Sequence, residues 1–315
     1  MADSSSKTVV YAALAGNLLV ALTKGVAAAL SGSSSMLSEA VHSLVDTGNE
    51  LLLLYGMHRA AKAATPEHPI GYGRELYFWS FIVAVLIFAL GAGVSIFEGV
   101  SHIRNPEPVE RAWVNYAVLG LAFVFEGVSW VISLRQYRAA MGDLGFFEAF
   151  RKSKDPPSFM VFFEDSAALV GIVLAAAGTY ASDSLDLPVL DGAASIAIGL
   201  VLAVVAVLLA RESKSLLIGE RADRALSDSI LRVAGEVPSV ARANGLITVQ
   251  MAPDQVVAML SLEFADELRT PEIEKAVTEI EQRVRQAHPE VVSLFVKPQT
   301  HRTYLDKLQE LEAGR

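Results

Sequence analysis

The sequence predicts a membrane all-α bundle of six transmembrane helices, followed by a C-terminal α+β domain with the element order αββαβ. Of the 315 residues, 52% are hydrophobic and 19% are charged. Six apolar runs approach or exceed the length of about 20 residues that a helix needs to cross a bilayer. From about Glu212 the long apolar runs give way to shorter amphipathic segments. We therefore expect a transmembrane domain over residues 1–211 and a cytoplasmic domain over residues 212–315.

The six predicted spans are residues 8–30, 36–57, 76–103, 113–134, 159–180 and 189–210. Lys and Arg gather in the loops after the second, fourth and sixth spans, and the opposite loops hold only Arg104 and Arg111. Because positively charged loops stay cytoplasmic, both termini are predicted to face the cytoplasm. The N-terminal residues lack the basic segment of a cleavable signal peptide. We expect an integral membrane protein, with a bacterial inner membrane as the favoured location.

The C-terminal part alternates between helical and strand patterns. Residues 223–237 predict an amphipathic helix, and residues 245–251 and 256–264 predict strands with a period of two. Thr270 and Pro271 begin a helix that runs to about Ala287, because proline suits the first helical position. Residues 291–296 predict a third strand, and a polar helical tail follows Thr300. This order indicates a ferredoxin-like sheet with helices on one face.

Two groups of polar side chains interrupt the apolar runs. His42 and Asp46 lie four residues apart in the second span, so they share a helix face, and Asn49 extends that face. Glu164 and Asp165 lie in the fifth span. Ionisable groups at membrane depth are costly and usually mark a substrate path. Imidazole and carboxylate ligands suit a divalent transition metal. The sequence therefore predicts a metal-ion transport site between these spans.

Several function classes are disfavoured by composition and motifs. The formal net charge of −9 is opposite to the basic surface that binds nucleic acid. The chain contains no cysteine, which excludes disulfides and thiolate metal sites. We find no phosphate-binding Gly-Lys-Ser/Thr loop and no nucleophile elbow. The protein is therefore not expected to be an enzyme, and no tightly bound cofactor is expected.

Four stretches resemble one family of transporters. They are His42-Ser-Leu-Val-Asp46, His68-Pro-Ile-Gly-Tyr-Gly-Arg-Glu-Leu-Tyr-Phe-Trp-Ser80, Leu216-Leu-Ile-Gly-Glu-Arg-Ala-Asp223 and the αββαβ tail. Together with six spans, they are similar to the cation diffusion facilitators over nearly the whole chain. The resemblance implies a homodimer that exports divalent cations, chiefly zinc, in exchange for protons by alternating access. It also implies that the cytoplasmic domain serves regulation and dimer packing.

Carried over from this resemblance, the ligands of the second span are His42 and Asp46. In the fifth span Asp165 matches the family pattern, but the earlier ligand position is Val161, which cannot bind metal. Glu164 is a ligand, a proton carrier or an interhelical partner. Asn49 is favoured as a residue that hydrogen-bonds a ligand over one that binds the metal itself.

Two departures leave a second interpretation open. The stretch Phe163-Glu-Asp-Ser-Ala-Ala168 resembles the divergent branch that includes the ninth human zinc-transporter type. The family's accessory loop site keeps only His68, with Glu67 nearby. The rival hypothesis is a metal-sensing or scaffold membrane protein that does not transport.

Three further features carry structural expectations. Lys24, inside the first span, is predicted to pair with an acidic side chain. Asp191 is predicted to begin the sixth span rather than to bind metal. Gly91, Gly93 and Gly99 are predicted to allow close helix packing.

Overall fold

The chain divides into two compact units. The structure, a computed structural model, describes residues 2–109, 111–141 and 145–313. One unit comprises Met1–Arg59 and Glu75–Lys214, and the other comprises Ala60–Arg74 and Ser215–Arg315. The first residue and the last two, where the two predicted domains begin and end, lie outside the described ranges.

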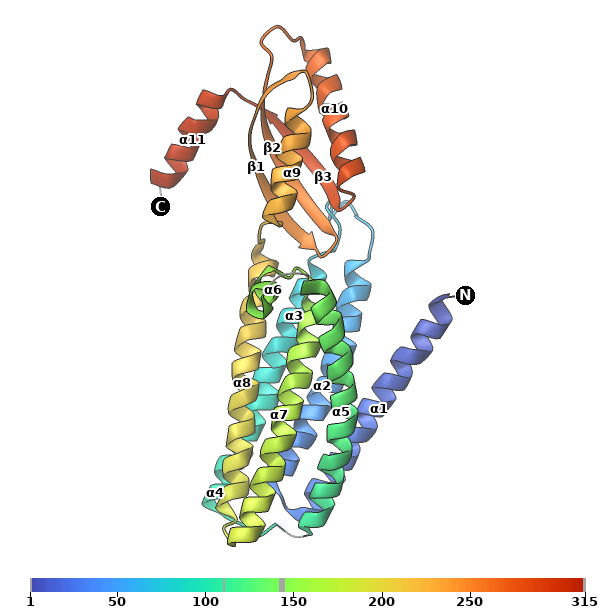
Figure 1. Cartoon of the computed structure of the whole chain (residues 1–315), viewed down its shortest axis with the longest axis vertical. Coiled ribbons are helices and arrows are strands. Elements are labelled where there is room, and N and C mark those ends of the chain that lie inside the picture. The colour runs from blue at the N-terminus through green and yellow to red at the C-terminus, as the bar shows by residue number, and fades with distance from the viewer. Residues whose placement is uncertain (1, 110, 142–144, 314–315) are drawn as a thin grey trace. The chain divides into compact units, whose positions relative to one another are not determined.

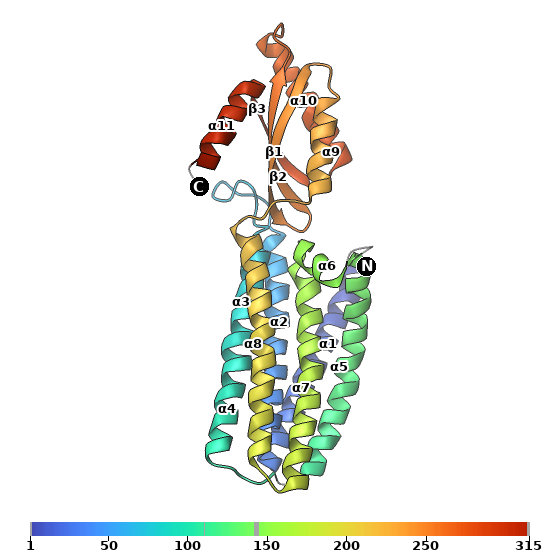
Figure 2. The same ribbon diagram turned by 60° about the vertical axis from the view of Figure 1, so that its left-hand side comes forward.

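Helices coincide with all six predicted spans (Figures 1 and 2). Five spans are single helices: α1 (Ala2–Ser31), α2 (Ser34–Ala60), α5 (Ala112–Met141), α7 (Pro156–Leu185) and α8 (Val189–Ile218). The third span consists of three consecutive elements: α3 (Glu75–Leu86), the π-helical segment η1 (Ile87–Ala92) and α4 (Gly93–Arg104). A short helix that the sequence did not predict, α6 (Phe146–Lys152), precedes α7. Both views show α5 and α7 side by side along their lengths.

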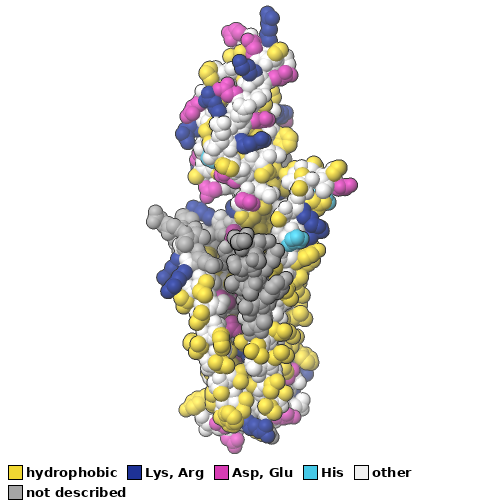
Figure 3. All heavy atoms as spheres, turned by 90° about the vertical axis from the view of Figure 1, so that its right-hand side faces the viewer, with side chains coloured by type: hydrophobic (Ala, Val, Ile, Leu, Met, Phe, Trp, Pro, Cys, Tyr) yellow, Lys and Arg dark blue, Asp and Glu magenta, His cyan; other side chains and the backbone are white. Residues whose placement is uncertain are grey.

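Four of the described helical stretches are long and apolar enough to cross a membrane. They are Glu75–Arg104, Ala112–Arg135, Pro156–Leu185 and Val189–Ile218. Hydrophobic side chains are numerous on the coloured part of the helical unit that faces the viewer in Figure 3. Among the residues whose side chains the structure describes, Asn17–Ser31 of α1 forms a shorter apolar helix. The polar residues of α2 lower its hydropathy, so the prediction of six spans is confirmed only for four.

A tight turn joins α1 to α2. Gly32 adopts a φ of 66°, and its N–H donates to the Ala28 carbonyl at 2.9 Å, the geometry of a helix C-terminal glycine. Ser33 precedes α2 and caps its N-terminus, because the Ser33 Oγ accepts a hydrogen bond from the Met36 N–H at 3.1 Å. This turn therefore fixes where α2 starts and which of its residues face the neighbouring helices.

Glycines allow α4 and α8 to approach closely. A Cβ added to Gly99 would stand 2.5 Å from the Gly192 carbonyl oxygen, and one added to Gly192 would stand 2.8 Å from the Gly99 carbonyl oxygen. The prediction of close packing is confirmed at Gly99. At Gly91 and Gly93 the nearest atoms lie 3.4 Å and 3.6 Å away, which is ordinary contact.

Replacing Gly99 by valine is expected to lower the free energy of unfolding by about 1–3 kcal/mol, because the added atoms force α4 and α8 apart. Thermal unfolding of the purified protein in detergent measures this loss. Gly120→Val is the matched control, since nothing lies within 4 Å of a Cβ at Gly120. Equal losses in both variants would contradict the expected close contact.

The second unit has the predicted order αββαβ. Its elements are α9 (Arg224–Gly235), β1 (Val240–Ala252), β2 (Gln255–Phe264), α10 (Thr270–Ala287), β3 (Val291–Pro298) and a final helix, α11 (His301–Ala313). The sheet order is β1-β2-β3, with β1 antiparallel and β3 parallel to β2. Figure 2 shows α9 and α10 on one side of the sheet and α11 on the other.

The core of this unit lies between the sheet and α9 with α10. The β2 face predicted to be apolar, which includes Ala258, Leu260 and Leu262, is buried there against Ile230 and Ile280. The loop before α3 belongs to the same unit. A Cβ on Gly73 would stand 2.9 Å from both the Ala252 Cβ and the Met251 carbonyl oxygen, so only glycine fits at this contact.

Candidate functional site

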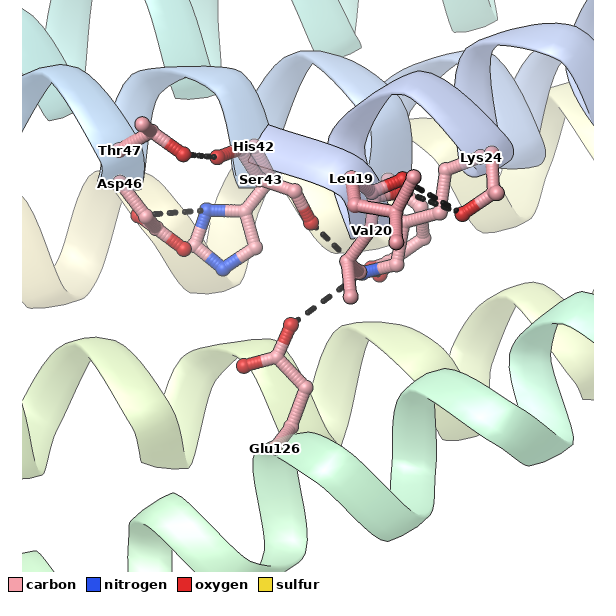
Figure 4. A network of polar contacts seen from close by, with 10 residues as sticks. Leu19, Val20, Lys24, His42, Ser43, Asp46, Thr47 and Glu126 are labelled. Atoms are coloured by element: carbon pink, nitrogen blue, oxygen red, sulfur yellow. Dashed lines mark hydrogen bonds and ion pairs between the residues drawn. The ribbon is translucent and has the colours of Figure 1, made fainter. Parts of the chain in front are cut away.

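His42 and Asp46 lie next to each other on α2. The His42 Nδ1 is 3.4 Å from the Asp46 Oδ1 (Figure 4). The imidazole is buried, with 1% of the residue exposed. Neither ring nitrogen has a hydrogen-bond partner within the described part of the chain. A buried imidazole with free nitrogen atoms is costly in a protein interior and is suited to accept a ligand.

The two acidic residues of α7 face different helices. The Asn49 amide donates to the Glu164 Oε1 at 3.0 Å, so Glu164 faces α2. Asp165 accepts hydrogen bonds from Ser129 at 3.1 Å and Ser133 at 2.9 Å, and both serines belong to α5. This split follows from helix geometry, since adjacent residues point about 100° apart. Asn49 therefore contacts a predicted ligand.

The structure brings the predicted residues into one region without closing them around a metal. Asp46 interacts electrostatically with both Glu164 and Asp165. Within the described ranges, no three His, Asp or Glu side chains are grouped closely enough to hold a metal ion. The pairs His42–Asp46 and Asn49–Glu164 are formed, whereas Asp165 is bonded to α5. Whether these residues bind metal stays a prediction.

A buried ion-pair network lies beside this region. The Lys24 ammonium donates to Glu39 Oε2 at 3.0 Å and to Ser43 Oγ at 2.8 Å, and it is 3.5 Å from Glu126 Oε1. Lys24 and Glu39 are fully buried. The prediction that Lys24 pairs with an acid is confirmed. The network joins α1, α2 and α5, because Glu126 projects from α5 (Figure 4).

Asp191 connects the start of α8 to the turn before α2. It accepts hydrogen bonds from the Ser33 Oγ at 2.9 Å, the Ser35 Oγ at 2.5 Å and the Ser35 N–H at 3.1 Å. It also lies in the first turn of α8, as the sequence predicted. A buried carboxylate with this number of donors is satisfied, which gives Asp191 a structural role rather than a metal-binding one.

Sequence reasoning missed two acidic residues of α2. Glu39 pairs with Lys24, and Glu50 accepts a hydrogen bond from the Asn17 amide at 2.7 Å. A signal for them was present, since Glu39, His42, Asp46 and Glu50 recur at intervals of three or four residues and so lie on one side of α2. An imidazole and carboxylates near such a stripe are a ligand set for a divalent cation.

Comparisons with known proteins point to a family of transport proteins. Residues 10–218 match the family model of the cation efflux transmembrane domain. The chain is 34% identical over 213 residues to the proton-coupled zinc antiporter SLC30A9, mitochondrial, of Xenopus laevis, covering 67% of this chain and 38% of that protein. It is 34% identical over 223 residues to metal tolerance protein C4 of Arabidopsis thaliana, covering 70% and 49%. The chain thus spans less than half the length of these two relatives.

A bacterial relative is matched over more of its length. The chain is 25% identical over 270 residues to the cation-efflux pump FieF of Klebsiella pneumoniae, which covers 82% of this chain and 81% of that protein.

Proposed function

Because the chain belongs to the cation efflux family, a family of membrane transporters rather than enzymes, we propose that it exports a divalent cation, principally zinc, in exchange for protons. The observation that carries this proposal is the buried His42, which lies next to Asp46 and whose ring nitrogens form no hydrogen bond among the described residues. A neutral imidazole and ionised carboxylates form a suitable zinc ligand set. The name of the Xenopus relative supports zinc and protons as the exchanged ions.

The ion would bind between α2 and α7. His42 and Asp46 supply ligands from α2, Asp165 supplies one from α7, and Asn49 holds Glu164 in place. These residues do not surround an ion in this structure, so a movement of the helices would bring the ligands together and form the complete site. Rocking of the helices would alternately open it to each side of the membrane.

Proton coupling follows from the ligand chemistry. The imidazole must be neutral and the carboxylates ionised before they can bind a cation, so binding displaces protons and protonation displaces the cation. Release of the cation is therefore favoured on the side of the membrane that has the higher proton concentration. The protein thus needs no ATP-hydrolysing machinery to drive export.

The arrangement in the membrane is part of the proposal. In it, α1 and α2 cross the bilayer together with the four apolar helical stretches, and both termini face the cytoplasm. The protein works as a homodimer, and the C-terminal unit serves dimer packing. A bacterial inner membrane remains the proposed location; among the relatives, the matched FieF pump is bacterial and the SLC30A9 antiporter is named mitochondrial.

Zinc flux into proteoliposomes tests the function. With the vesicle interior more acidic than the outside, we expect faster zinc uptake than with equal pH, because internal protons displace the bound cation. Dissipating the pH gradient with a proton ionophore is the control, and it should remove the acceleration. Parallel assays with cobalt, iron and manganese test the choice of zinc.

The same assay separates transport from the sensing or scaffold hypothesis. Saturable zinc binding to the purified protein without any zinc flux, at any pH gradient, would favour the second hypothesis. A zinc flux that does not depend on the pH gradient would contradict the exchange of zinc for protons.

A further inference from the structure

The longest polar contact of the Lys24 ammonium is the one to Glu126. A lysine ammonium has three N–H donors. Two are used in bonds of ordinary length to Glu39 and Ser43, at 3.0 Å and 2.8 Å. The third partner, the Glu126 Oε1, is 3.5 Å away, which is longer than an N–H···O bond of about 2.7–3.2 Å. Glu126 is therefore the partner that Lys24 can release while remaining paired.

Glu126 also lies within electrostatic reach of the candidate site. Its carboxylate acts on Asp46 of α2, on Glu50 of the same helix and on Asp165 of α7. It retains 18% side-chain exposure, whereas Lys24 and Glu39 have none. The carboxylate thus borders both the Lys24 network and the acidic residues of α2 and α7.

In α7 the candidate site has a metal-binding side chain at Asp165 but none one helical turn earlier. In α7 the position four residues before Asp165 is Val161, whose side chain cannot bind a cation. His42 is buried nearby with both ring nitrogens unpartnered among the described residues. A carboxylate from α5 would supply the oxygen donor that α7 lacks, because α5 and α7 pack side by side.

We propose that Glu126 is a further ligand of the transported cation, and that Lys24 holds this carboxylate when the cation is absent. This inference rests on the proposed function. When a cation binds at His42, Asp46 and Asp165, Glu126 exchanges its contact with the Lys24 ammonium for a contact with the cation. Lys24 keeps Glu39 and Ser43, so its charge stays paired inside the helical unit. On release, Lys24 takes the carboxylate back and so disfavours rebinding.

Zinc binding to the full-length protein in detergent, measured against a competing chelator, tests the exchange. Glu126→Gln is expected to weaken zinc binding about tenfold or more. Lys24→Met combined with Glu39→Gln removes one positive and one negative charge and frees Glu126. This double variant is expected to bind zinc severalfold more tightly and to release it more slowly in proteoliposomes.

One control and one substitute variant accompany these substitutions. Glu98→Gln removes a carboxylate from α4, which supplies none of the proposed ligands, and should leave zinc affinity unchanged. If Glu126→Gln does not fold, Glu126→Asp, whose carboxylate reaches less far, should show the same weakened binding.

The outcomes distinguish this inference from the proposed function. Zinc affinity unchanged in Glu126→Gln, with binding lost in His42→Ala, would overturn the role of Glu126 alone. An unchanged affinity in the double variant would overturn the exchange with Lys24. Unchanged binding in His42→Ala would overturn the proposed function and this inference together.

Discussion

Replacing His42 by alanine is expected to reduce zinc flux by at least about 100-fold. Substituting residues that merely support metal ligands already costs roughly 10–100-fold in metal affinity, so removing the only imidazole of the site should cost more. The α2 helix should persist, because alanine is the strongest helix former. Initial rates of zinc uptake into proteoliposomes, driven by an acidic interior, measure the loss.

The matched control is His102→Ala. His102 is also a buried histidine on a membrane helix, with 8% exposure, but it lies in the last turn of α4, which supplies none of the proposed ligands. This variant should transport zinc at nearly the unaltered rate. Equal rates in the two variants, or a His42→Ala protein as active as the unaltered one, would show that His42 does not bind the cation.

Replacing Lys24 by alanine is expected to lower the free energy of unfolding by about 3–5 kcal/mol. Lys24 and Glu39 are both fully buried, and Lys24 also reaches Ser43 and Glu126. Removing one partner of a buried ion pair leaves the other charge uncompensated, and this is the source of the large cost. Reversible unfolding of the purified protein in detergent micelles measures the change.

The double variant Lys24→Met with Glu39→Gln tests the cause of that loss. It removes both charges and keeps side chains of similar volume, so most of the stability should return. If the Lys24→Ala variant were as stable as the unaltered protein, the buried ion pair would not contribute to stability as expected. A double variant that is no more stable than the single one would assign the loss to packing rather than to charge.

The C-terminal unit could be predicted closely because short patterns determine it. In β2, the face predicted to be apolar, with Ala258, Leu260 and Leu262, is buried, whereas the other face is mixed: Met259 is 39% exposed and Val257 is 5% exposed. The observed strands are longer than predicted at some ends; β1 begins at Val240 rather than at residue 245. The extra residues do not alternate regularly between apolar and polar side chains, and they pair with β2 in an irregular register. A search for a period of two therefore does not find them.

The helical unit was predictable in its helices but not in its side-chain partners. The length of each apolar run predicted where each helix lies. The π-helical turn at Ile87–Ala92, by contrast, has no periodic signal in the sequence. The choice of Glu39 as partner of Lys24 depends on how α1 packs against α2. The same holds for Asp165, whose bonds to α5 follow from helix rotation that the sequence does not specify.

The interpretation of Glu164 illustrates this difference. Spacing left three roles open for it, a ligand, a proton carrier or an interhelical partner. The structure shows a hydrogen bond to Asn49 of α2, so the interhelical contact exists, and the other two roles stay predictions. Asn49 was expected to hydrogen-bond a ligand, and its amide does contact one of the predicted metal-binding residues.

The most direct test of the central claim is an anomalous-scattering map of the zinc-loaded, full-length protein, recorded at the zinc absorption edge. We expect a peak between α2 and α7, about 2.0–2.1 Å from a ring nitrogen of His42 and bonded to carboxylate oxygens of Asp46 and Asp165. Zinc peaks confined to the C-terminal unit, with His42 and Asp165 still apart, would contradict it.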